Sequence, residues 1–124
     1  MDAKQLCLAL TAGFVLLATS ACSRDVSFAE NIHPMLEQRC GTCHENDGEG
    51  VAASGFSVAS YDDLMKGTKY GPVIEPGNSL NSSFMLLVEQ KTSREIHMPR
   101  DSERLNDEQI AMLKTWIDGG ARNN

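Results

Sequence analysis

Two cysteines and a histidine lie within the five consecutive residues Cys40-Gly41-Thr42-Cys43-His44. The C-x-x-C-H spacing is typical of covalent haem attachment, because each thiol can add across one vinyl group of a porphyrin. The two thioether bonds then hold His44 against the macrocycle, where an imidazole nitrogen can bind the iron as the proximal ligand. A flat cofactor bonded at two points constrains the fold more than any other feature of this sequence. We therefore predict one covalent haem c.

A C-x-x-C pair has two other common uses, as half of a zinc site and as a redox-active dithiol. A zinc site of the usual kind needs a second pair of ligands, and no cysteine follows Cys43. A thioredoxin-like dithiol occurs in a βαβ context, which does not follow this motif. Haem attachment is therefore the favoured interpretation.

The first 21 residues have the features of a signal peptide. Lys4 supplies a positive charge, an apolar run extends over residues 6–17, and small residues precede Cys22. The run is too short for a convincing membrane-spanning helix, so we expect cleavage. The small residues before Cys22 resemble a bacterial lipobox, which implies cleavage before Cys22 and attachment of lipid to its thiol. The alternative is ordinary cleavage near Ala21, which leaves Cys22 as a free thiol.

These predictions account for all four cysteines, because Cys7 leaves with the signal peptide, and we expect no structural disulfide. The sequence has a net charge of −6, and removal of residues 1–21 does not change it, because that segment contains one Asp and one Lys. An acidic surface disfavours nucleic acid and charge-driven docking on anionic lipid. It permits a partner protein with a basic face.

After a tether at residues 22–26, the spacing of apolar residues predicts helices and no strands, and so one all-α domain over residues 27–124. The first helix has apolar residues at helical spacing from Phe28 to Leu36. Ser27 is the predicted N-cap, with Glu30 as its capping-box partner. Pro34 should delay or bend this helix.

His33 departs from the apolar stripe of this first helix, and we predict a surface histidine there and not a ligand. Residues 45–55 are rich in Gly, Asp and Glu and predict a loop. Short helices are expected at residues 61–66 and within residues 79–90. A last helix should begin after Asn106, with Gln109 as capping-box partner, and end at Gly119-Gly120.

The second axial position of the iron decides the chemistry, because a thioether there gives a closed, high-potential electron carrier. We predict Met98 as this distal ligand, since Pro99 restricts the backbone of Met98 to an extended conformation. Adjacent residues of an extended chain point in opposite directions, so only one of His97 and Met98 can face the iron. His97, Met85 and an open site remain alternatives. Met85 and Met112 lie on expected helices, where filling the core is their ordinary role.

The motif, Gly71-Pro72, Met98-Pro99 and a closing helix with Trp116 together resemble a class I, mitochondrial-type cytochrome c. The series F-x-x-x-I-x-P, G-P-V-I-x-P-G-N, M-P and W-I-D-G-G-A is similar to a monohaem domain common in planctomycetes and other bacteria. The resemblance implies a small all-α fold whose N- and C-terminal helices cross beside the haem, with His44 and Met98 as axial ligands. It also implies that the Pro72 carbonyl accepts a hydrogen bond from Nδ1 of His44.

These features predict an exported, lipid-anchored, monomeric monohaem cytochrome on the periplasmic side of a bacterial cell envelope. It would carry single electrons between redox protein partners and touch the membrane only through lipid on Cys22, or be soluble in the periplasm without that lipid. Nothing in the sequence marks a substrate pocket with paired acids, so we do not predict an enzyme. A peroxidase-like haem enzyme and a haem-based ligand sensor remain alternatives, and both need an open or displaceable sixth site.

Overall fold

The computed structural model describes residues 25–124, so the predicted signal peptide and Cys22 lie outside the described residues. Its helical elements, in chain order, are η1 (Phe28–Ile32), α1 (His33–His44), α2 (Glu49–Ser54), α3 (Tyr61–Lys66), α4 (Ser83–Val88) and α5 (Asp107–Asp118). Residues 25–124 contain no strand, and one isolated bridge joins Thr68 and Gly71. The all-α prediction is confirmed. None of the helices within this range is long and apolar enough to cross a membrane.

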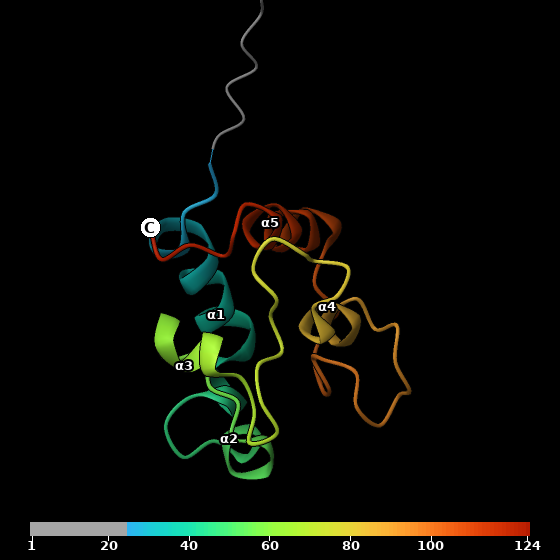
Figure 1. The fold of residues 1–124 in the computed structure, drawn as a ribbon. Helices are drawn as coiled ribbons and strands as arrows, with labels where there is room; N and C mark the ends of the chain where they lie inside the picture. The colour runs from blue at the N-terminus through green and yellow to red at the C-terminus, as the bar shows by residue number, and fades with distance from the viewer. Residues whose placement is uncertain (1–24) are drawn as a thin grey trace, which may run out of the picture.

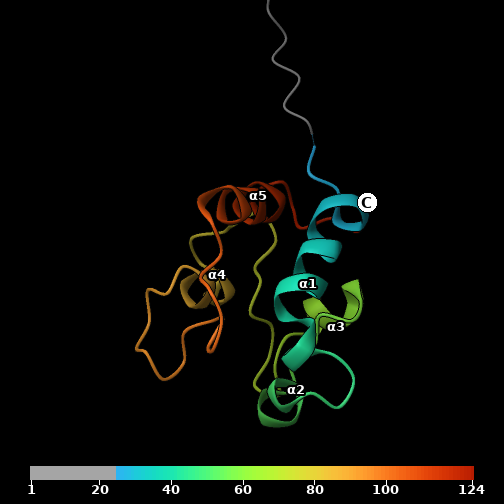
Figure 2. The same ribbon diagram turned by 180° about the vertical axis from the view of Figure 1, so that it is seen from behind.

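The elements are arranged around one extended segment. Figures 1 and 2 show α1, α2 and α3 on one side, α4 on the other, and residues 67–82 passing between them. α5 lies across one end of the molecule and contacts η1, where the ring centroids of Phe28 and Trp116 are 5.7 Å apart. The predicted packing of the N- and C-terminal helical segments is therefore present.

The first helical segment changes its hydrogen bonding just before Pro34. Ser27 caps it as predicted, because its hydroxyl accepts a hydrogen bond from the Glu30 amide at 3.1 Å. The Ser27 amide donates to Oδ1 of Asn31 and not to Glu30, so the predicted capping-box partner is wrong. Residues Phe28–Ile32 are π-helical, and Pro34 follows in the first turn of α1, so the change of helical hydrogen bonding falls next to the residue that has no amide hydrogen.

The connection after α1 differs from the prediction. Residues 45–55 were expected to form a loop, but they contain the helix α2, which ends at Gly55 with a φ of 76°. α2 has no buried residue, so its sequence contains no apolar stripe that would mark a helix. Its position depends instead on close contacts with the end of α1, described below.

The helices α3 and α4 lie where the sequence predicts them. α3 is capped by Ser60, whose hydroxyl accepts from the Asp63 amide at 3.1 Å, and it ends at Gly67. α4 is shorter than the predicted segment, and its N-cap Ser82 makes no side-chain capping hydrogen bond. The buried residues of α4 are Phe84, Met85 and Val88.

α5 begins with the predicted capping box. Asn106 Oδ1 accepts from the Gln109 amide at 2.8 Å, and Gln109 Oε1 accepts from the Asn106 amide at 3.0 Å. The helix ends at Gly119, as predicted. Its buried stripe consists of Ile110, Leu113, Trp116 and Ile117.

Asn106→Ala is expected to lower the free energy of unfolding by about 1 kcal/mol, because the Gln109 amide at the start of α5 loses its side-chain partner. Urea denaturation of the holoprotein measures this change. Asn123→Ala is the matched control, since Asn123 is exposed and its side chain makes no hydrogen bond within residues 25–124. Equal stabilities of the two variants would show that the capping box contributes nothing.

The residues after α5 return to the start of η1. The main-chain oxygen of Asn124 accepts from the Ala29 amide at 2.9 Å, and its Oδ1 accepts from the Phe28 amide at 2.9 Å. The Tyr61 hydroxyl donates to the Ala121 carbonyl at 2.8 Å. These bonds join α3, η1 and the C-terminal segment, and they fix the helix that leads into the C-x-x-C-H motif.

Candidate haem site

Cys40, Cys43 and His44 lie on the last two turns of α1, and both cysteines are free and partly exposed. Burial raises the pKa of the Cys40 thiol to about 11, against a smaller opposing effect of Arg39. A raised pKa lowers the share of thiolate, which is the form that reacts in redox dithiols. Within residues 25–124, no group of three or more His, Cys, Asp or Glu side chains is arranged to hold a metal ion.

His44 is oriented by a hydrogen bond to the backbone. Its Nδ1 lies 3.0 Å from the carbonyl oxygen of Phe56. Because a carbonyl can only accept, Nδ1 carries the hydrogen and Nε2 is left as the nitrogen that can bind iron. Two free thiols at the required spacing and an imidazole fixed in this tautomer fit a covalently attached haem.

The resemblance implied that Pro72 accepts this hydrogen bond, and the structure gives that place to Phe56. The physical reason is the path of the chain after α2. Gly55 turns the chain back, and the amide of Val58 donates to the His44 carbonyl at 2.8 Å, so residues 56–58 lie beside the end of α1. Pro72 is exposed, and a contact between it and the haem stays a prediction.

Two glycines, Gly48 at the N-cap of α2 and Gly50 in its first turn, lie directly against the motif. A Cβ atom on Gly50 would be 2.6 Å from Cε1 of His44 and 2.8 Å from the Cys43 carbonyl oxygen. A Cβ atom on Gly48 would be 2.4 Å from that same carbonyl oxygen. Both positions therefore need glycine, and α2 supports one edge of the His44 ring. Sequence reasoning missed these roles, because glycines in an acidic segment are typical of a loop.

Gly50→Ala is expected to displace the His44 ring and to cost about 1–3 kcal/mol in stability, because the added methyl group has no room. The proportion of haem with histidine ligation, measured from the optical spectrum, should fall. Ala52→Ser adds a similar volume to the exposed face of α2 and should leave the spectrum unchanged. A normal spectrum and stability in Gly50→Ala would contradict the close packing.

A series of aromatic contacts connects His44 to α4. The ring centroids of His44 and Phe56 are 5.2 Å apart, and those of Phe56 and Phe84 are 6.0 Å apart. One turn further along α4, the Leu87 carbonyl accepts a hydrogen bond from the Met98 amide at 3.0 Å. α4 therefore contacts both the surroundings of the predicted proximal ligand and the segment of the predicted distal ligand.

Met98 is half-buried and packs against the hydrophobic core, and its peptide bond to Pro99 is cis. Its role as an iron ligand stays a prediction. Met85 is only 2% exposed within the core, and the half-buried Met112 packs against the same core, in agreement with the core-filling roles expected of them. His97 is half-buried on the same loop as Met98.

His33 is less exposed than the prediction of a surface histidine implied. Its Nε2 lies 3.2 Å from the Ala59 carbonyl oxygen, and its ring centroid is 5.3 Å from that of Phe28. The residue joins the first turn of α1 to the segment before α3.

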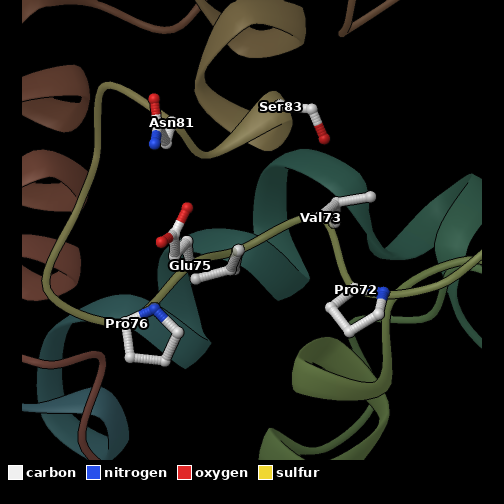
Figure 3. A pocket seen from close by; sticks show the side chains of 7 residues that line it. Pro72, Val73, Glu75, Pro76, Asn81 and Ser83 are labelled. Carbon is white, nitrogen blue, oxygen red and sulfur yellow. The ribbon is translucent and has the colours of Figure 1, made fainter.

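An open cavity of about 310 Å³ lies between residues 72–76 and the start of α4 (Figure 3). Residues 72–76 form one wall, and the polar residues Asn81 and Ser83 form the other. A Cβ atom on Gly67 would lie 2.4 Å from the Gly71 carbonyl oxygen, so the backbone at Gly67 packs closely against the backbone just before residues 72–76. The lining residues are Pro72, Val73, Ile74, Glu75, Pro76, Asn81 and Ser83.

Comparison with known protein families shows to which family this chain belongs. The family described as Planctomycete cytochrome C matches residues 40–102, from the first cysteine of the motif to just beyond Met98. The chain belongs to this family. Membership indicates haem c binding and haem-based electron transfer, and it suggests a location outside the cytoplasm. No curated protein and no solved structure matches the chain.

The match defines which parts of the cytochrome are common to the family. It covers the end of α1, the elements α2 to α4 and the Met98 loop, whereas η1 and α5 lie outside it. The contact between Phe28 and Trp116 therefore rests on the structure of this chain and not on the family match.

Proposed function

We propose that this cytochrome is an exported monohaem protein that carries single electrons between redox partners of the bacterial cell envelope. His44 and Met98 are the proposed axial ligands, and Cys40 and Cys43 the proposed thioether bonds. The observation that carries the proposal is the C-x-x-C-H motif at the end of α1 with Nδ1 of His44 held by the Phe56 carbonyl. When bound, haem supplies the reversible one-electron chemistry of its iron.

The residues of the chain fix the ligands and limit access of water. The Phe56 carbonyl orients the His44 ring and makes Nε2 more basic. Phe56 and Phe84 are 8% and 4% exposed, and they supply apolar surface next to His44. A thioether at the distal position favours the reduced iron, so Met98 would raise the reduction potential relative to a second histidine.

Export and lipid attachment at Cys22 belong to the same proposal. They are supported by the apolar run, by the small residues before Cys22 and by membership in a cytochrome c family. The acidic charge of −6 supports a redox partner with a basic face, and the exposed Asp47 and Glu49 lie close to the motif in sequence. We expect the protein to act as a monomer.

The optical spectrum of the ferric holoprotein tests the proposal. A weak band at the red end of the visible spectrum, typical of sulfur–iron ligation, would support the electron carrier. High-spin features together with peroxide turnover would instead support a haem enzyme. High-spin features with reversible gas binding and no turnover would support a sensor.

A further inference from the structure

The loop of residues 89–104, which carries Met98, is joined to the haem-attachment helix α1 by Arg39, the residue before Cys40. Arg39 Nη2 donates to the carbonyl oxygen of Glu103 at 2.5 Å, and the carbonyl oxygen of Arg104 lies 3.4 Å from the same nitrogen. These two residues end the loop, because Leu105, which follows, is only 1% exposed. The contact spans more than sixty residues of sequence, since the separations are 64 and 65.

The two ends of this loop are held differently. At its start, the Glu89 carboxylate pairs with Lys114 of α5 at 2.5 Å and with Lys91 at 3.0 Å. Met98 itself is held through its amide, which donates to the Leu87 carbonyl. Residues 100–104 beyond it are all exposed, so little buried surface holds this part of the loop. The hydrogen bonds from Arg39 therefore matter most at the end that follows Met98.

The guanidinium of Arg39 has an unusual environment. Its Nε is buried without a hydrogen-bond partner, and none of the ion pairs among residues 25–124 includes Arg39. Carbonyl oxygens, and no carboxylate, therefore hold this cation. Its positive charge is not neutralised next to Cys40, and it opposes the effect of burial on the Cys40 thiol.

We propose that Arg39 is a positioning residue that holds the Met98 loop closed against the haem-attachment helix. By fixing the carbonyls of Glu103 and Arg104, it limits movement of Met98 away from the iron, and its charge favours the reduced iron. The inference rests on the proposed role of Met98 as the distal ligand. The position of the loop itself, however, depends only on contacts within the chain.

The test uses the ferric holoprotein and imidazole, which competes with Met98 for the iron when the loop opens. Arg39→Gln should bind imidazole roughly 10- to 100-fold more tightly than the parent protein, which is the factor expected when hydrogen bonds from a charged donor are lost. Hydrogen exchange at the amides of residues 98–105 should become faster. Arg94→Gln is the matched control, because it removes the same charge from an exposed residue of the same loop. Its imidazole affinity should change by less than about twofold.

Arg39→Lys separates charge from geometry and serves if Arg39→Gln does not accumulate as holoprotein. It keeps the positive charge but not the planar fork, so imidazole should still bind more tightly while the reduction potential stays near that of the parent. Equal imidazole affinity and loop exchange in the Arg39 variants and Arg94→Gln would overturn the proposal. If the parent protein shows no sulfur–iron band, the assignment of Met98 fails, whereas faster loop exchange in Arg39→Gln would still support the positioning role.

Discussion

A chain in which Cys40 and Cys43 are both replaced by alanine is expected to lose covalent haem and to be largely unfolded. Residues 25–124 bury only a modest apolar core, as expected for a domain of this size, so the cofactor should supply much of the missing apolar surface. A ligand present at a thousand times its dissociation constant stabilises a fold by about 4 kcal/mol, and covalent attachment should exceed this. Haem absorbance after denaturing electrophoresis and the helical signal in circular dichroism measure the two effects.

The single variants provide the controls for this prediction. Cys40→Ala and Cys43→Ala should each keep one thioether bond, and so keep haem through denaturation at reduced yield. Cys40 should be the more costly of the two, because its side chain packs against the core. A double variant that retained haem absorbance after denaturation would show that the cysteines are not the attachment points.

The second large effect is expected for Met98→Ala. Loss of the thioether should remove the sulfur–iron band and lower the reduction potential by on the order of 0.1 V, within the roughly 0.8 V range that axial ligands set. Potentiometric titration followed by absorbance measures both changes in one experiment. The fold should persist, because Met98 is only half-buried at the edge of the core.

Two control variants separate Met98 from its alternatives. Met112→Ala removes another half-buried methionine and should leave the band and the potential unchanged. His97→Ala tests the neighbouring ligand candidate and should likewise keep the band. If His97→Ala changed the spectrum while Met98→Ala did not, the distal ligand would have to be reassigned to His97.

Local sequence signals predicted the parts of the fold that depend on neighbouring residues. The predicted caps at Ser27 and Asn106 are formed because each side chain reaches an amide three residues ahead. α2 was not predictable in this way, because it buries no side chain of its own. Its glycines are needed where the backbone meets Cys43 and His44, and that requirement appears only once the chain has folded.

In the candidate site, too, the sequence predicted the residues that are neighbours in the chain and missed the contacts that depend on the fold. Cys40, Cys43 and His44 are adjacent in sequence, so their spacing alone predicts their chemistry. The residue that accepts the hydrogen bond from His44 Nδ1 depends on the path of the chain after α2. The resemblance to class I cytochromes c implied Pro72, whereas the acceptor in the structure is the carbonyl of Phe56. Contacts across sixty or more residues, such as those made by Arg39, leave no pattern in a single sequence.

The intact mass of the exported, processed protein tests the central claim most directly. We predict the mass of the processed polypeptide with its proposed lipid on Cys22, plus one haem that is retained after denaturation and acidic organic extraction, because thioether bonds survive both treatments. The mass of the polypeptide alone, or a zinc ion bound between Cys40 and Cys43, would contradict the account.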